Sequence, residues 1–182
     1  MRSLTAPGFG TTVAAAWIVA AAGVCGCGGS GSDPATGSSH GARDEAPISL
    51  SLRTADGRTV ALEDQRGSPV LLAVLATYDG VSQAAMRPLS RFARDHQDVL
   101  VLGILAQPDA ATFAPLFEQA MASPFAITWD PSDSLTRGTS DLGPLDAVPT
   151  FIAIRPDGRI GARHVGFMSE RDMEIMIESV GH

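Results

Sequence analysis

Two unbroken apolar runs dominate the middle of the chain. They cover residues 70–76 (VLLAVLA) and 99–106 (VLVLGILA). Runs of this length without polar alternation are typical of strands buried on both faces. Between them, residues 82–96 place five apolar side chains at helical spacing, namely Ala85, Met86, Leu89, Phe92 and Ala93. The pattern predicts a strand–helix–strand unit whose two strands are parallel neighbours.

The segments on either side of this unit add shorter elements. Residues 48–52 and 59–62 read as two strands joined by the turn dipeptide Asp56-Gly57, so they predict an N-terminal β-hairpin. After the second apolar run we expect a helix that starts near Thr112, because Pro115 is tolerated only in a first turn. Its predicted buried face consists of Phe113, Leu116, Phe117 and Ala120. A short strand at 125–129 and a turn-rich stretch at 130–143, with a short helix around Ser134, follow.

The C-terminal part predicts two strands and a helix. An apolar strand at 147–154 is followed by the turn 156–158 and a returning strand at 159–165. Ser169 and Asp172 have the spacing of a capping box at the start of the last helix. Residues 47–182 therefore predict one α/β domain with a central mixed sheet, flanking helices and an N-terminal β-hairpin extension.

The first 46 residues have a different composition. Residues 1–26 combine Arg2 with a short apolar segment at 13–22, which suits an export signal and is too short to span a bilayer. The segment ends in small residues and two cysteines, and it resembles a bacterial lipoprotein box. Cys27, preceded by Gly26, fits the lipidated position better than Cys25; a secreted protein cleaved without lipidation is the alternative. Residues 27–46 are Gly- and Ser-rich and predict a flexible tether.

Composition excludes several classes of function. The formal net charge of −7 and the 5% aromatic content argue against a nucleic-acid partner. Cys25 and Cys27 are the only cysteines, so residues 28–182 contain no thiol. A disulfide or a cysteine-ligated metal within the predicted domain is therefore excluded. The histidines have no spacing typical of a metal site, and we expect neither metal nor cofactor.

The junction at 76–82, followed by Met86-Arg87-Pro88-Leu89, resembles the thioredoxin-like fold. The most similar branch is that of the exported thiol–disulfide oxidoreductases of the TlpA type, often called redoxins. In that family the junction reads Ala-Thr-Trp-Cys-x-x-Cys, so the two cysteines fall on Asp79 and Ser82. The resemblance also implies a cis peptide bond before Pro149, in the stretch Val148-Pro149-Thr150.

The resemblance implies where a partner would bind, but the family's thiol reaction is not possible with Asp79 and Ser82 in place of the cysteines. Its binding surface would comprise Tyr78, Asp79, Gly80, Val148, Pro149 and Thr150. We expect Asp79 to cap the following helix, with Ser82 sharing the task. Use of the Asp79 carboxylate as an acid–base group or metal ligand, or as a partner contact, remains open. Tyr78 and Trp129 are expected to be packing residues.

Two hypotheses for function follow. The first is a membrane-anchored, exported protein without redox cysteines that acts as a binding or accessory module in the cell envelope. Its partners would be extended polypeptides or envelope redox proteins, and it would face the periplasm or the cell exterior. The second is a redoxin-type thiol–disulfide oxidoreductase or peroxide reductase that uses a thiol supplied by another chain.

Overall fold

The computed structural model describes residues 46–181, which include nearly all of the predicted domain. The predicted export signal, Cys27 and the tether up to residue 45 lie outside the described residues. Among the helices that are described, none is long and apolar enough to cross a membrane.

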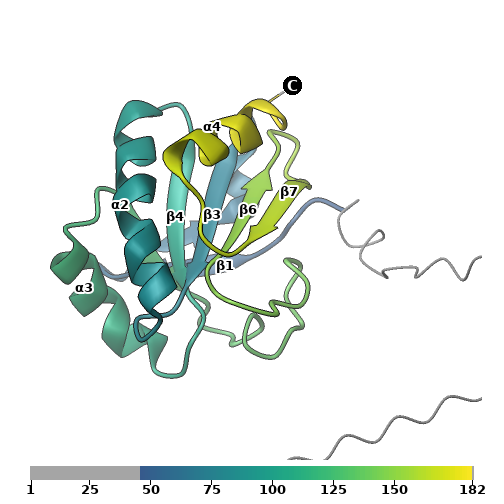
Figure 1. The fold of residues 1–182 in the computed structure, drawn as a ribbon. Helices are drawn as coiled ribbons and strands as arrows, with labels where there is room; N and C mark the ends of the chain where they lie inside the picture. The colour runs from purple at the N-terminus through teal and green to yellow at the C-terminus, as the bar shows by residue number, and fades with distance from the viewer. Residues whose placement is uncertain (1–45, 182) are drawn as a thin grey trace, which may run out of the picture. The chain divides into compact units, whose positions relative to one another are not determined.

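The domain is built on one mixed seven-stranded sheet (Figure 1). The strand order is β2-β1-β5-β4-β3-β6-β7. The strands are β1 (Ser51–Thr54), β2 (Thr59–Ala61), β3 (Val70–Leu75), β4 (Leu100–Leu105), β5 (Ala126–Trp129), β6 (Thr150–Ile154) and β7 (Ile160–Val165). The helices are η1 (Leu62–Gln65, a 3-10 turn), α2 (Gly80–Asp95), α3 (Ala110–Met121) and α4 (Glu170–Glu178).

The central strands confirm the parallel unit predicted from the apolar runs. β3 pairs in parallel with β4, from Val70 opposite Leu100 to Leu75 opposite Leu105, and β4 pairs in parallel with β5. β6 lies antiparallel on the other side of β3. The predicted hairpin of β1 and β2 extends the sheet, because β1 pairs antiparallel with β5. β3 is thus covered on both edges, and all six of its residues are buried.

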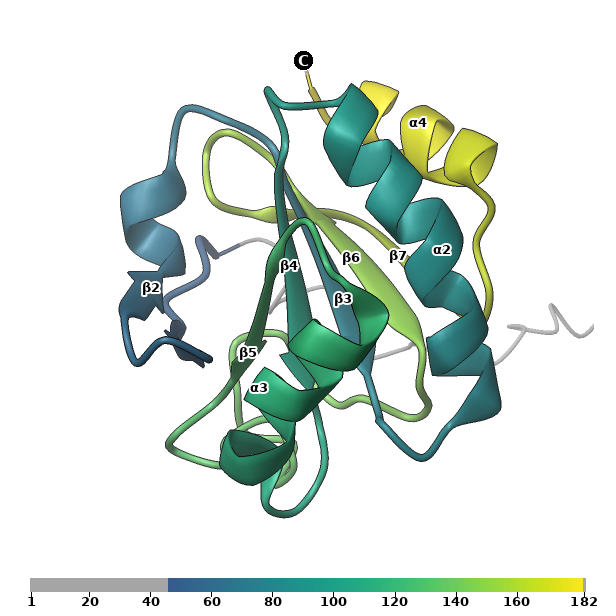
Figure 2. The same cartoon turned by 90° about the vertical axis from the view of Figure 1, so that its left-hand side faces the viewer.

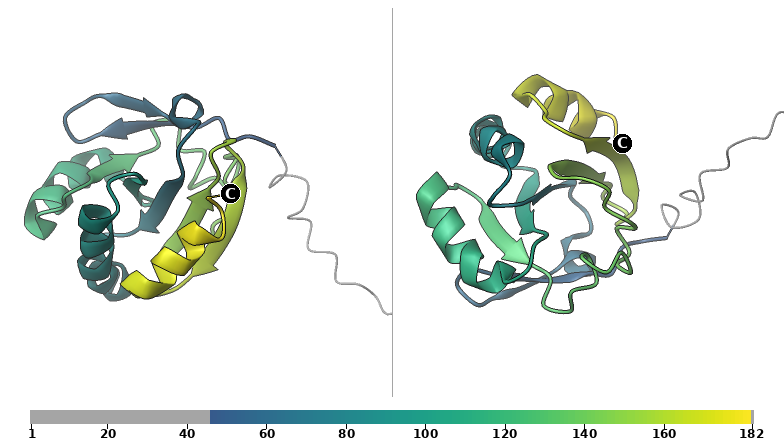
Figure 3. Two further views of the ribbon diagram at one scale, coloured as in Figure 1. Left: turned by 90° about the horizontal axis from the view of Figure 1, so that it is seen from above. Right: turned by 60° about the horizontal axis from the view of Figure 1, so that its bottom comes forward.

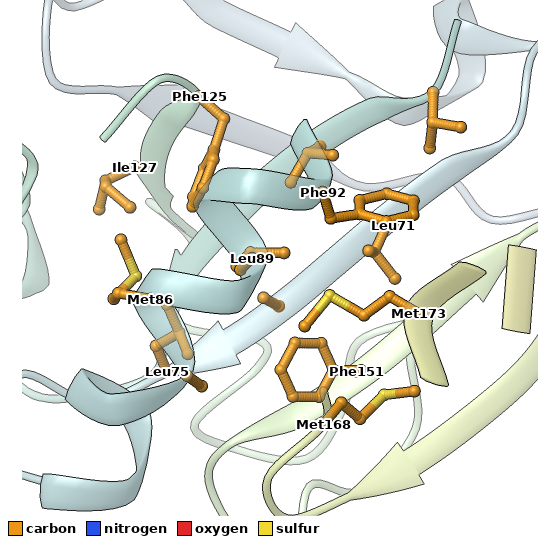
Figure 4. Close-up of a cluster of buried hydrophobic side chains, with 14 of the residues drawn as sticks. Leu71, Leu75, Met86, Leu89, Phe92, Phe125, Ile127, Phe151, Met168 and Met173 are labelled. Carbon is orange, nitrogen blue, oxygen red and sulfur yellow. The ribbon is translucent and has the colours of Figure 1, made fainter. Parts of the chain in front are cut away.

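Alternate residues of each central strand point to opposite faces of the sheet and pack in two separate hydrophobic cores. One set, which includes Leu71 and Leu75 of β3, packs with residues of α2, α3 and α4. The other set, which includes Leu72 and Val74, packs with Ile48, Leu50 and the segment 130–148. All three long helices therefore cover one face of the sheet, while irregular chain and the 3-10 turn cover the other (Figures 1 and 2). Figure 4 shows the helix-side core, in which Phe92, Phe151 and Met173 converge.

Helix α3 differs from its prediction. It begins at Ala110, two residues before the predicted start, so Pro115 lies in its second turn. Its buried face is formed by Ala110, Ala114 and Phe117, whereas Phe113 and Leu116 are exposed. The rotation of this helix about its axis is set by the packing of its small alanines against the sheet. The spacing of its larger side chains therefore did not predict which face is buried.

The stretch 130–143 contains no short helix around Ser134, contrary to expectation. It is organised by Asp130, whose carboxylate accepts hydrogen bonds from the hydroxyls of Ser132 and Ser134 (both 2.6 Å) and from the backbone N–H of Leu135 (3.0 Å). Burial by itself raises the pKa of Asp130, and these hydrogen bonds outweigh it, so the pKa is lowered. The ionised carboxylate therefore holds these turns together by its hydrogen bonds to nearby side chains and backbone.

The predicted helix α4 is confirmed in detail. Ser169 is the N-cap, and its side chain and that of Asp172 form the expected capping box. Met168 and Met173, placed like a hydrophobic staple around this cap, are both buried. The C-terminal end of α4 then leads to Val180, which packs on β7 at Gly161.

We predict that Gly161→Ala lowers the free energy of unfolding by about 1–3 kcal/mol, because its new methyl group would overpack this contact. A Cβ at Gly161 would lie 2.8 Å from the Cβ of Val180, which is close to the backbone and cannot turn away. Gly80→Ala is the matched control, since nothing lies within 4 Å of a Cβ there. Urea unfolding measures both variants; equal midpoints for the two would contradict the predicted packing.

Candidate functional site

Asp79 begins helix α2 at the end of the buried strand β3. It is the N-cap residue, and its carboxylate accepts a hydrogen bond from the backbone N–H of Ser82 at 2.6 Å. Hydrogen bonds from the hydroxyl and the N–H of Ser82 hold the pKa of Asp79 below its ordinary value of 3.8. The expected capping role of Asp79 is thus confirmed, and the carboxylate is ionised at neutral pH.

Ser82 lies behind this cap and is fully buried. Its hydroxyl oxygen accepts a hydrogen bond from the backbone N–H of Ala76 at 3.3 Å. Ser82 therefore connects the first turn of α2 back to the end of β3, and it supports the cap from the inside. A hydroxyl in this position has no access to solvent.

Two glutamines hold the junction between β3 and α2 in place, and neither was predicted from the sequence. The side-chain oxygen of Gln107 accepts a hydrogen bond from the N–H of Thr77, and the side-chain amide of Gln83 donates to the Thr77 carbonyl, both at 2.7 Å. Gln107 is buried and directly follows β4 and Ala106. The sequence did carry a signal for Gln107. It is a polar residue just after an apolar run, at the sheet edge where β3 also ends.

The segment around Pro149 lies at the same edge of the sheet. The Val148–Pro149 bond is cis, as the resemblance implied. Thr150 pairs with Val74, so Pro149 and Val148 stand beside the chain that leaves β3 toward Asp79. The Thr150 hydroxyl donates to the Ala147 carbonyl at 2.6 Å, which closes the loop around the proline.

A pocket of about 580 Å³ separates the two loops. Tyr78 lines it from the α2 side and Val148 from the proline side, with Gln107 and Arg137 among the other residues. Tyr78 is 74% exposed, so it is a surface residue and the expectation that it packs inside the domain is wrong. Trp129 is partly buried against the helix-side core, as expected.

The structure thus brings the six predicted surface residues to one edge of the sheet, in two groups. Tyr78, Asp79 and Gly80 come from the start of α2, and residues 148–150 come from the start of β6. No histidine lines the pocket between them. Within residues 46–181 no group of three or more His, Cys, Asp or Glu side chains is placed to hold a metal ion. What the site offers chemically is a capped helix start, an exposed tyrosine and loop backbone.

Comparison with known proteins identifies the fold. No family model and no curated protein matches the chain. The exposed lipoprotein thioredoxin Etrx1 from Streptococcus pneumoniae strain TIGR4 is 21% identical with a TM-score of 0.62, over 71% of this chain and 98% of that chain. MTB dsbF is 18% identical with a TM-score of 0.63, over 74% and 96%. StoA from Bacillus subtilis is 15% identical with a TM-score of 0.59, over 72% and 97%.

We predict that Asp79→Ala lowers the melting temperature by about 2–4 °C at neutral pH, because the N–H groups at the start of α2 lose their acceptor. A carboxyl whose pKa is lowered by folding stabilises the protein above its unfolded pKa and stops doing so as pH falls through the folded pKa. The difference from wild type should therefore be constant above the ordinary value of 3.8 and shrink below it.

Thermal unfolding followed by circular dichroism across this pH range measures the effect. Asp79→Asn keeps an acceptor oxygen without the charge, so its loss at neutral pH should be smaller than that of Asp79→Ala. This smaller loss should also shrink below 3.8, since the titrating group is the Asp79 of the wild-type chain. An Asp79→Ala loss that stayed constant down to the acid limit would show that the charge of Asp79 does not contribute.

The strand order, the three helices on one face, the cis-proline and these structural relatives agree with the fold predicted from the sequence. The described domain therefore has the thioredoxin-like fold, and its α2 helix starts at Asp79, where the family resemblance places the first of two cysteines.

Proposed function

We propose that this chain is an exported, lipid-anchored protein that binds an extended polypeptide or an envelope redox protein, without performing thiol chemistry itself. The observation that carries the proposal is the replacement of sulfur by oxygen at the start of α2. Asp79 and Ser82 occupy the two positions, and no cysteine occurs after Cys27. Two structural relatives, both from Chlorobium tepidum, are named as thiol:disulfide interchange proteins, and that reaction requires the missing thiols.

Neither oxygen group supports a substitute reaction. A carboxylate with a lowered pKa is a weak nucleophile toward sulfur, and that of Asp79 already accepts hydrogen bonds from the helix start. Ser82 is fully buried, and neither of the described histidines is hydrogen-bonded to it to act as a base. The arrangement stabilises the fold and leaves binding as the activity that the surface supports.

The backbone beside Pro149 supports the binding of an extended chain. Within the described domain, no hydrogen bond uses the N–H or the carbonyl of Val148. An extended polypeptide that lies along this loop gains backbone hydrogen bonds there, as in strand addition to a sheet edge. The exposed ring of Tyr78 on the other side of the pocket supplies apolar contact area.

The anchor part of the proposal is supported by the N-terminal sequence. Cys27 follows a short apolar segment and precedes a Gly- and Ser-rich stretch. One structural relative is named as an exposed lipoprotein thioredoxin. A tether of about 20 residues has a root-mean-square reach of about 25 Å, so the domain would remain close to the membrane and still be free to turn.

The absence of thiol catalysis is tested with an insulin-reduction assay. The full-length chain should give no turnover above a boiled control, whereas the double variant Asp79→Cys/Ser82→Cys should gain disulfide exchange because the helix start stabilises a thiolate. The single variant Ser82→Cys is the matched control, because a buried thiol alone should remain unreactive. Turnover by the wild-type chain would overturn the proposal and favour the oxidoreductase hypothesis.

Lipidation is tested by changing the predicted anchor. Cys27→Ala should release the protein from the membrane fraction and abolish the acyl mass, because the modified thiol is gone. Cys25→Ala is the matched control and should stay membrane-bound, since residue 25 belongs to the predicted signal. Fractionation and intact mass measure both; membrane retention of Cys27→Ala without acyl mass would contradict the predicted anchor.

A further inference from the structure

Helices α2 and α4 pack side by side (Figure 3). A second concave surface lies between them. It is a groove of about 610 Å³, lined by Arg87 and Arg91 of α2, by Phe167 in the loop before α4, and by Arg171 and Glu174 of α4. We call it the arginine groove. None of the binding residues predicted from the sequence lies in it.

The charges of the arginine groove do not balance internally. Arg171 donates to the Glu174 carboxylate at 2.9 Å, and Glu174 also lies 3.7 Å from His96. Arg87 and Arg91, one helical turn apart, have no ion pair or hydrogen bond with any residue in the described part of the chain. After the Arg171–Glu174 pair, the groove therefore holds two guanidinium groups without a partner among the described residues and one such carboxylate, Glu170, on a protein with a net charge of −7.

The groove is continuous with the loop at Pro149. The carbonyl of Pro149 accepts a hydrogen bond from the N–H of Gly166 at 2.8 Å, and Phe167 follows directly. Phe167 is 50% exposed and forms a wall of the groove. Phe167 therefore lies between the loop at Pro149 and the two arginines, where a chain bound beside Pro149 and directed toward α4 would pass.

The spacing gives the register of such a chain. Arg87 and Arg91 lie eight and twelve residues beyond Asp79 on α2, which corresponds to about 12 and 18 Å along the helix axis. An extended chain rises about 3.3 Å per residue. Because Asp79 and Pro149 lie at the same edge of the sheet, a chain that extends along α2 from this edge reaches the arginines after about four to six residues.

We propose that the arginine groove binds carboxylate side chains of the extended polypeptide, located about four to six residues from the part held beside Pro149. This inference rests on the proposed function and specifies its partner as an acidic segment with an apolar residue for Phe167. Guanidinium groups pair with carboxylates through two parallel hydrogen bonds, which gives direction as well as attraction.

An anionic membrane surface fits the groove less well. A bilayer surface is flat, whereas Arg87 and Arg91 line a concave groove between two helices. The carboxylates of Glu170 and Glu174 lie on the same groove and would repel anionic headgroups. A narrow polypeptide can place its carboxylates against the arginines and avoid both glutamates.

The test measures binding of labelled peptides to the full-length protein by fluorescence anisotropy. Each peptide carries one apolar anchor and, about four to six residues to either side of it, two Glu or two Gln. The Glu peptide of one polarity should bind about five to ten times more tightly than its Gln counterpart at low salt, and this ratio should approach one at high salt.

Arg87→Gln/Arg91→Gln should remove the preference for Glu and leave the affinity for the Gln peptide unchanged. The charge-matched control Arg58→Gln/Arg94→Gln changes one arginine of the β1–β2 turn and one at the end of α2, both outside the groove, and should keep the preference. This control separates the groove from the overall charge of the protein.

Three results would overturn the inference. Equal binding of Glu and Gln peptides would reject the arginine groove and leave the proposed function standing. Binding of neither peptide would reject both. Arginine-dependent binding to phosphatidylglycerol vesicles, together with no preference among the peptides, would assign the groove to a membrane surface.

Discussion

The start of helix α2 must satisfy its free backbone N–H groups at the point where a fully buried strand leaves the core. In this chain the Asp79 carboxylate does so by accepting from the N–H of Ser82, while the Ser82 hydroxyl accepts from the N–H of Ala76, the residue that follows β3. A thiolate in the same place would be stabilised by the same N–H groups and would remain reactive. Because the fold requires an acceptor there and does not require a nucleophile, the redox pair can be lost while the fold is kept.

The two faces of the sheet have different roles in placing the site. The helix-side face is packed by three regular helices, which fix the position and direction of α2. The other face is covered by irregular chain from Asp130 to Val148, in which the Asp130 carboxylate holds the turns up to Leu135 and Arg163 donates to the carbonyls of Leu142 and Pro144. This irregular segment ends at Pro149. One half of the site therefore depends on helix packing, and the loop half depends on side-chain hydrogen bonds to its backbone, among them those of Asp130, Arg163 and Thr150.

Most of the fold could be predicted from the sequence because its strands are long apolar runs and its turns carry specific residues. The buried strand at 70–75 and the capping box at Ser169 are local patterns with local causes. The rotation of α3 could not be predicted in this way, since Ala114 is buried and Leu116 exposed by contacts with strands distant in sequence. The predicted helix near Ser134 was wrong because Asp130 competes for the backbone N–H groups.

The site, like the fold, could be predicted only where local sequence motifs determine it. Asp79 and Pro149 could be located because each belongs to a short local motif, and the cis bond before Pro149 came from the resemblance alone. Gln83 and Gln107 could not, because their function depends on which backbone groups at Thr77 remain unpaired once the sheet has formed. The arginine groove could not be predicted from the sequence either, because it forms only when α4 packs on α2.

The loss of sulfur also changes where binding energy has to come from. An oxidoreductase holds its substrate through a transient covalent disulfide, so its non-covalent contacts can be few. A protein with oxygen at both positions has only non-covalent contacts, and the surface beside Pro149 offers one unpaired backbone residue and one exposed tyrosine. Specific binding of a flexible polypeptide must also offset the entropy of ordering it. In the function proposed above, the groove of Arg87 and Arg91 would supply this additional interaction and would limit the partners to polypeptides with suitably placed carboxylates.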